Sequence, residues 1–377
     1  MSTVFHFNGV IRNVSYSPTM AGNLKTYPFE AFNINTAKGE GIIRIDDAIS
    51  IGISKWISPK RTRSFPFARL YSTYHLPKRI TVIPVIKDEG AGGDNDRINF
   101  ITFSWMNLAN IYVIFAHYND AARHRNRDDK ITAQKFDADY INEKIAEILR
   151  YQQTALHWNI MHFERDFEQV YRQAIDAYQR IGNALDVPMH RINNHVKTLE
   201  SFVMDNKVSL DGFKKATLPK SLDAARRETV TTHELEYLTE ETKSLFSITN
   251  WLGGEYHLTA DEILRDEDGT IIIREAKNAS RAKLPSLNDI KDGLFKLILF
   301  ANMHELYLEG VPIPFRTELR LTGNLREDLT LPASDEAITH FSQVNRLTKN
   351  ELKRLTALNG EAIANQERNL TISLGQH

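Results

Sequence analysis

The first third of the chain carries the hydrophobic pattern of β-strands. Runs rich in β-branched residues cover 41–45, 48–54 and 79–86, and each has the length of one strand. A glycine-rich stretch at 90–95 then supplies residues typical of a turn. This part of the chain is therefore predicted to be rich in strands.

The middle third changes to the period of a helix. From Asp137 onwards, apolar residues recur every three or four positions, which predicts one amphipathic helix running to Ile181. At 1.5 Å per residue this helix would be about 65 Å long, and it is predicted to end at Gly182. Shorter helices are expected around 186–205 and 231–248.

The last third alternates strands and helices. In chain order, the pattern predicts a strand pair over 253–264, a turn at 266–269, a strand over 270–277, a helix beginning at 285–286, a strand over 314–322 and helices within 333–365. This order predicts an α/β (α+β) class, with helices flanking a mixed sheet.

One segment has the length of a membrane span. Residues 98–118 contain no Asp, Glu, Lys or Arg, and a spanning helix needs about 20 residues. Six polar side chains interrupt the segment, and lipid offers buried amides no partner. A short strand followed by a buried core helix is predicted instead. Because residues 1–11 lack the features of an export signal, a cytoplasmic protein is expected.

Composition narrows the classes of function. The chain has 377 residues, is 42% hydrophobic and 25% charged, and balances 47 Lys and Arg against 48 Asp and Glu. The absence of cysteine excludes zinc fingers, iron–sulfur clusters and thiol nucleophiles. The length predicts two or three cores. They are placed at 1–130 (strand-rich), 131–230 (helical) and 231–377 (α/β with C-terminal helices).

Three residues near the end of the chain could form a catalytic site. On a strand, Glu275 and Lys277 share one face, and a hairpin through 266–269 would return the strand after Asp261 against them. Two carboxylates held together form a hard-oxygen site suited to Mg²⁺, with Mn²⁺ as a substitute. Lys277 would orient a water molecule and neutralise developing charge.

The acid-x-Lys pattern is weak evidence by itself. It occurs six times, beginning at Asp128, Asp205, Glu241, Glu275, Asp289 and Glu351. Only Glu275 ends a β-branched run that follows both a turn and an upstream acid. The alternative interpretation is that Glu275 and Lys277 are surface residues closing an ordinary strand.

The arrangement Ala260-Asp261…Glu275-Ala276-Lys277 resembles the signature of the PD-(D/E)XK nuclease superfamily over about residues 231–322, with Ala in place of the usual Pro. More loosely, the chain is similar to type II restriction endonucleases. The resemblance implies Mg²⁺-dependent, site-specific hydrolysis of double-stranded DNA at 231–377, with recognition by 1–130. It also implies a DNA methyltransferase as functional partner.

The resemblance adds candidates on the neighbouring helices. A fourth acid often comes from the helix before the hairpin, and Glu234 is chosen among several glutamates there. On the helix after the motif, Lys291 or Lys296 would face the phosphate. For each of these residues, solvation of a charged helix face is the alternative.

A basic segment lies far from this motif in sequence. Residues 48–87 contain no Asp or Glu, and aromatic residues lie among their cations. Such a stretch suits a phosphate backbone and base edges. The candidate DNA contacts are Lys60, Arg61, Arg63, Arg69, Lys78 and Arg79. A basic surface loop is the alternative.

Two other functions stay open. One is a structure-specific, single-strand or repair nuclease of the same fold, and the other is an inactive DNA-binding protein. Enzymes that cut palindromes are often two-fold dimers, so the helix at 137–181 would serve in a homodimer or pack within its own chain. His190 and His195 lack a metalloprotease motif and are predicted to lie on a helix surface.

Overall fold

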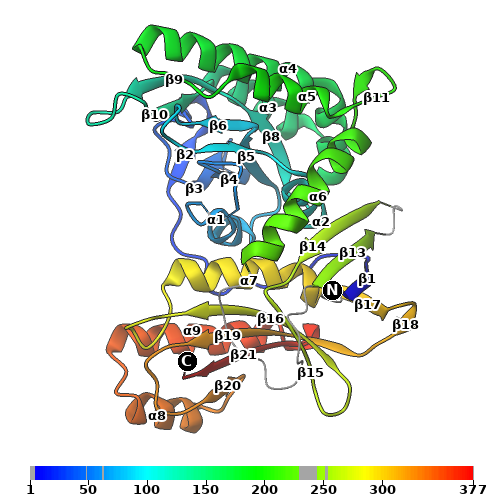
Figure 1. Cartoon of the computed structure of the whole chain (residues 1–377). Helices are drawn as coiled ribbons and strands as arrows, with labels where there is room; N and C mark the ends of the chain where they lie inside the picture. Colours follow the sequence, from blue (N-terminus) through cyan, green and yellow to red (C-terminus); the bar gives the residue numbers. More distant parts are fainter. Residues whose placement is uncertain (1–4, 48, 62, 229–243, 251–253, 377) are drawn as a thin grey trace. The chain divides into compact units, whose positions relative to one another are not determined.

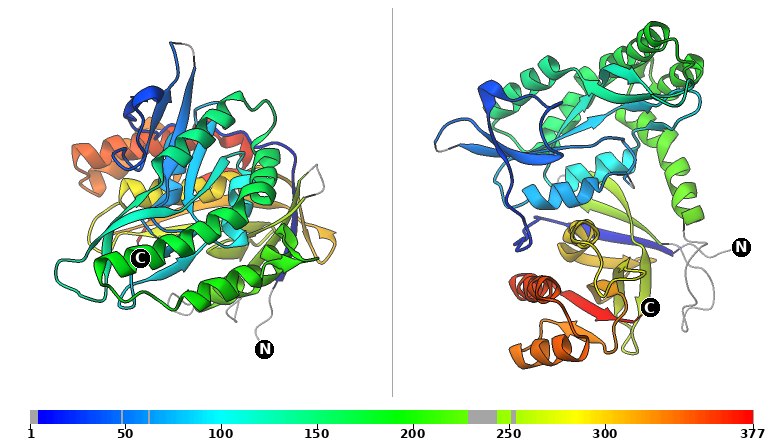
Figure 2. Two further views of the ribbon diagram at one scale, coloured as in Figure 1. Left: turned by 90° about the horizontal axis from the view of Figure 1, so that it is seen from above. Right: turned by 90° about the vertical axis from the view of Figure 1, so that its left-hand side faces the viewer.

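The computed structural model describes residues 5–47, 49–61, 63–228, 244–250 and 254–376. The class is mixed α/β with several mixed sheets, as predicted (Figures 1 and 2). Two compact units share the chain: unit 1 comprises 1–23, 67–75 and 224–377, and unit 2 comprises 24–66 and 76–223. This division differs from the three continuous ranges expected from the sequence, because the N-terminal strand pairs with strands of the second half of the chain.

Unit 2 is built on a five-stranded sheet. Its strands, in spatial order, are β2 (Thr26–Pro28), β3 (Glu40–Arg44), β4 (Ser50–Lys55), β5 (Arg79–Pro84) and β8 (Tyr112–Ala116). The β3–β4 pair is antiparallel and the other pairs are parallel. Short pairs are β6 (Ile86–Asp88) with β7 (Asn95–Arg97), β9 (Tyr118–Arg123) with β10 (Ile131–Phe136), and β11 (Val203–Met204) with β12 (Lys207–Val208). The strands predicted over 41–45 and 48–54 are confirmed as β3 and β4, whereas the run predicted over 79–86 is divided between β5 and β6, which belong to different sheets.

The helices of this region are α2 (Phe100–Leu108), α3 (Ala138–Arg150), α4 (Ala155–Leu185), α5 (Ile192–Glu200) and most of α6 (Leu210–Glu228), whose last five residues are assigned to unit 1. The prediction for 98–118 had the order wrong. The buried helix α2 comes first and the strand β8 follows it. No helix in the described part of the chain is long and apolar enough to cross a membrane.

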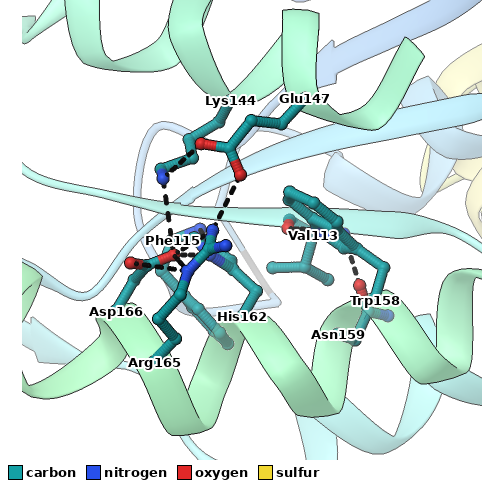
Figure 3. Close-up of polar contacts among 9 residues, drawn as sticks. All are labelled: Val113, Phe115, Lys144, Glu147, Trp158, Asn159, His162, Arg165 and Asp166. Carbon is teal, nitrogen blue, oxygen red and sulfur yellow. Dashed lines mark hydrogen bonds and ion pairs between the residues drawn. The ribbon is translucent and has the colours of Figure 1, made fainter. Parts of the chain in front are cut away.

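The single helix predicted over 137–181 is two helices. Thr154 caps α4 by accepting a hydrogen bond from the backbone N–H of His157. Lys78 Nζ donates to the carbonyl oxygens of Ile148 and Tyr151, at 2.7 and 3.0 Å, and so satisfies the end of α3. Neither Thr154 nor Lys78 belongs to the apolar stripe of the predicted helix, so the apolar periodicity did not reveal that the helix is interrupted between α3 and α4. Figure 3 shows charged side chains that link α3 to α4.

The predicted end of the long helix was also wrong. Gly182 lies inside α4, where an added Cβ would meet Met189 Cγ at 2.5 Å. The helix ends at Asp186, whose φ of 50° is left-handed.

Unit 1 contains two five-stranded sheets. The first has the order β14 (Glu255–Thr259), β13 (Ser244–Asn250), β1 (Phe5–Ile11), β17 (Met303–Leu308) and β18 (Val311–Pro312). The second has the order β15 (Glu262–Arg265), β16 (Ile271–Asn278), β19 (Phe315–Thr322), β21 (Leu370–Gly375) and β20 (Leu329–Leu331). In Figure 1 the blue strand β1 lies between β13 and β17, which shows how the start of the chain joins a sheet formed by strands of its second half.

Two predictions for this unit need correction. Residues 244–248 were expected to be helical and instead belong to strand β13, while 229–243 lie outside the described residues. The strands predicted over 253–264 exist as β14 and β15 but do not pair with each other; they join different sheets. The strands at 270–277 and 314–322 are confirmed as β16 and β19.

The helices of unit 1 are α1 (Pro66–Thr73), α7 (Leu287–Ala301), α8 (Asp335–Val344) and α9 (Lys349–Ala364). The predicted helix start at 285–286 is confirmed, since Ser286 caps α7 by accepting from the N–H of Asp289. Helix α7 packs on β16 and β19 (Figure 1). Its apolar face is fully buried, so β16 is held firmly beneath it.

Candidate active site

A hairpin brings Asp261 beside Glu275. Strands β15 and β16 pair antiparallel from Arg265 opposite Ile271 to Glu262 opposite Arg274. Asp261 directly precedes this register, so it lies level with Glu275. The turn uses Gly269, whose φ of +88° suits a residue without a Cβ. The sequence predicted this hairpin, and the structure contains it.

The side chains form a line of alternating charge. Lys296 Nζ lies 3.2 Å from Asp261 Oδ1 and also donates to Glu275 Oε1. Lys277 Nζ lies 2.8 Å from the same Glu275 oxygen and 3.1 Å from Asp292 Oδ2. Three carboxylates therefore alternate with two ammonium groups in the order Asp261, Lys296, Glu275, Lys277 and Asp292. We call these five residues the carboxylate–lysine chain.

Helix α7 reaches the strand closely because of a glycine. A Cβ on Gly293 would lie 2.7 Å from Leu319 Cδ1 and 3.3 Å from Glu275 Cγ. Asp292 and Lys296 are four residues apart, so they lie on one side of the helix, one turn from each other. Gly293 thus lets both side chains reach the end of β16.

The electrostatics of the two carboxylates differ. Glu275 is only 2% exposed, and its burial, reinforced by the charge of Asp261, raises its pKa to about 8. Loss of solvation also acts to raise the pKa of Asp261, but attraction to Lys296 and Lys277 and the hydrogen bonds from Glu275 and Lys296 together outweigh it and hold that pKa below its usual value. For Lys277, burial opposes the charge, yet attraction to Glu275 raises its pKa. Near neutral pH the Glu275 carboxyl therefore favours its protonated form, and a cation that binds it would displace this proton.

These residues fit a magnesium ion that has two protein ligands. Asp261 and Glu275 offer hard oxygens, and Mg²⁺ is commonly bound by one or two carboxylates plus waters and substrate phosphate. Among the residues that the structure describes, no group of three or more His, Asp or Glu side chains could hold a metal. The raised pKa of Glu275 is a second sign of fit: burial causes most of it and the charge of Asp261 adds to it, and a divalent cation would offset that charge and favour the ionised carboxylate.

The other candidates of this region have separate outcomes. Glu234 lies outside the described residues. Lys296 belongs to the chain, whereas Lys291 is buried and donates to Ser72 Oγ at 3.2 Å. Sequence reasoning missed Asp292 and Gly293. The four-residue spacing from Asp292 to Lys296, on the helix that follows the motif, is the signal that could have found the acid.

Several cations of the basic segment (residues 48–87) already have partners within the protein. Lys60 lies 3.5 Å from Asp96, and Arg63 lies 2.7 Å from Asp94, so acids just beyond the segment neutralise both. Arg79 donates to a backbone carbonyl, and Lys78 binds the carbonyl oxygens at the end of α3.

Four aromatic residues of the basic segment belong to the core: Trp56, Phe67, Tyr71 and Tyr74. Arg61 and Arg69 fall in unit 2 and unit 1 respectively. DNA contact by these cations stays a prediction.

The interpretation of two histidines as surface residues was wrong for His195, which is 1% exposed. Its Nε2 lies 3.2 Å from Asp88 Oδ2, and His190 Nδ1 lies 2.7 Å from Asp88 Oδ1. Asp88 itself is buried and ends β6. The two histidines therefore attach the start of α5 to that strand.

Comparison with known proteins adds no relative: no family model, curated protein or solved structure matches the chain. The chemistry of the carboxylate–lysine chain is therefore the feature of this molecule that bears on its function.

Proposed function

We propose that this protein is a Mg²⁺-dependent nuclease of the PD-(D/E)XK type that cuts double-stranded DNA at specific sites. The observation that carries the proposal is the meeting of Asp261, Glu275 and Lys277 at the end of one hairpin, with Glu275 buried and its pKa raised. Strongly shifted carboxylates are enriched at functional sites. The order of hairpin, crossing helix and parallel strand in β15, β16, α7 and β19 also supports this fold type.

Each residue has a role that follows from its position. Asp261 and Glu275 would hold Mg²⁺, which when bound supplies charge stabilisation and a lower pKa for its water. Lys277 is fixed between Glu275 and Asp292. From there its ammonium would orient the attacking water and neutralise charge on the phosphate. The water oxygen would form a new bond to phosphorus and lose a proton to solvent, while the bond from phosphorus to the leaving oxygen breaks and that oxygen takes up a proton from solvent.

The proposed specificity for DNA sites rests on the resemblance and on the part of the basic segment that lies in unit 2. Arginine and lysine side chains are the groups that contact phosphates and guanine edges. In unit 2, Lys60 and Arg63 remain partly exposed beside their acidic partners. They could exchange these partners for phosphate oxygens when DNA binds.

The test is to incubate plasmid DNA with the protein and Mg²⁺ and to sequence the fragment ends. A site-specific nuclease gives discrete bands that share one end sequence. EDTA should abolish cutting, and Ca²⁺ should permit binding with little cleavage because its coordination is larger and looser. A smear would favour a nuclease without sequence specificity. Intact plasmid under all metal conditions would contradict the proposal.

A further inference from the structure

The two lysines of the carboxylate–lysine chain have different partners. Lys277 contacts Glu275 and Asp292, so it touches only one of the two carboxylates assigned to the metal. Lys296 contacts both of those carboxylates, Asp261 and Glu275. Its ammonium therefore stands where a cation shared by the two would stand.

The surroundings of Lys296 allow its side chain to move while its backbone stays in place. The neighbouring residues Phe295 and Leu297 are 0% and 1% exposed, which fixes this turn of α7. The Lys296 side chain is 17% exposed, so it reaches solvent. Lysine also carries its charge on a flexible four-carbon stem. The ammonium can therefore leave the carboxylates by rotation about its own side-chain bonds.

The charges of the carboxylate–lysine chain determine how strongly a divalent ion would be attracted or repelled there. With every group ionised, three carboxylates face two ammonium groups. A divalent ion at Asp261 and Glu275 would compete with Lys296 for the same oxygens and be repelled by its charge at close range. Lys277, in contrast, has Asp292 as a separate partner and can stay in place.

We propose that Lys296 is an internal cation that occupies the metal position, so that a divalent ion binds Asp261 and Glu275 only by displacing it. This inference rests on the proposed function, because it takes these two carboxylates as the metal ligands. Once displaced, the Lys296 ammonium lacks its carboxylate partners and can bind a phosphate of the DNA backbone instead. Metal and DNA binding should then favour each other, as linkage requires.

The experiment is calorimetric titration of the full chain with Mn²⁺, without DNA. Lys296→Met removes the competing charge and keeps an apolar stem, so it should bind Mn²⁺ about tenfold more tightly, since a charge-assisted bond no longer has to be broken. Lys277→Met should change the affinity by less than about threefold, because this lysine touches one ligand only. Lys296→Arg keeps the charge and should behave as wild type. Lys353→Met, on the exposed side of α9, is the control for loss of a lysine.

The outcomes separate the inference from the proposed function. If wild-type protein binds Mn²⁺ and Glu275→Gln abolishes that binding, but Lys296→Met binds no more tightly, the inference is wrong and the metal site stands. If equal gains follow from both lysine variants, general repulsion explains them and displacement is again refuted. If the wild-type chain binds no Mn²⁺ and cuts no plasmid, both the displacement by Lys296 and the proposed nuclease function are refuted. Should Lys296→Met not fold, Lys296→Gln provides the same comparison with a polar side chain.

Discussion

Each unit contains a cluster of acids and bases, and the two clusters affect their carboxylates in opposite ways. In unit 2, Arg165 Nη2 lies 2.8 Å from both Glu147 Oε2 and Asp166 Oδ2, and Lys144 Nζ lies 2.7 Å from Glu147 Oε1 (Figure 3). His162 adds a bond from Nδ1 to Asp166 at 2.7 Å. In unit 1, Glu275 shares two lysines with two further acids.

The pKa shifts express this difference. Burial acts to raise the pKa of both acids in unit 2, but their hydrogen-bonding and charged partners together outweigh it and lower both values. These partners are Lys144 and Arg165 for Glu147, and His162, Arg165 and Lys144 for Asp166. In unit 1 burial and the charge of Asp261 raise the pKa of Glu275 to about 8. The cluster of unit 2 links α3 to α4, whereas the carboxylate–lysine chain holds a buried carboxyl whose charged form is disfavoured and which a divalent cation would stabilise. Similar residue types therefore serve structure in one unit and, we propose, chemistry in the other.

The largest expected effect is the loss of cleavage in unit 1. Asp261→Asn and Lys277→Met should each lower the rate of plasmid cleavage by at least about 10²-fold, since each removes a charge at the reacting centre. The double variant should lose little more than either single variant, because groups that act together are non-additive. Full multiplication of the two losses would show independent roles and contradict the shared mechanism.

The pH dependence of stability should have opposite signs in the two clusters. Glu275 has a folded pKa of about 8 against an ordinary 4.5, so the folded state binds more protons and stability falls as pH rises between these values. Relative to Glu275→Gln, metal-free wild type should lose on the order of 2–4 kcal/mol between pH 5 and 9. Denaturant unfolding at several pH values measures this, and a flat difference would contradict the raised pKa.

For Asp166 the sign reverses. Its folded pKa is below the ordinary 3.8, so its stabilisation is complete above that value and is lost as pH falls through the folded pKa. At pH 7, Asp166→Asn should cost about 2–3 kcal/mol through weakened charged hydrogen bonds. It should leave cleavage within about twofold of wild type at a temperature where both are folded. A cleavage loss as large as that of Asp261→Asn would remove the contrast between the clusters.

The smallest expected effect concerns how closely α7 packs against β16 and β19 at Gly293. Gly293→Ala places a Cβ against Leu319 and Glu275, which should cost about 1–2 kcal/mol and lower cleavage as the helix shifts. Gly360→Ala on α9 is the matched control, since nothing lies within 4 Å of its added Cβ. That variant should gain about 0.5–1 kcal/mol from helix propensity. Equal stability of both variants in thermal unfolding would show that Gly293 is not required for close packing.

The sequence predicted the parts of this arrangement that are local. Asp261 and Glu275 are joined by one hairpin with a recognisable turn, and strand alternation places Glu275 and Lys277 on one face. The pairing of β1 with β13 and β17 is distant in sequence, so the domain division could not be read along the chain. Likewise, Asp94 and Asp96 neutralise a segment that looked basic because they lie just after its end.

The most direct test of the central claim compares two neighbouring glutamates of the β15–β16 hairpin. Glu275→Gln alters the buried carboxylate assigned to the metal, whereas Glu262→Gln alters one that contacts Arg274, outside the carboxylate–lysine chain. We predict that in Mg²⁺ the first variant leaves supercoiled plasmid intact while the second cuts it at nearly the wild-type rate. Cleavage by Glu275→Gln at the wild-type rate would contradict the account.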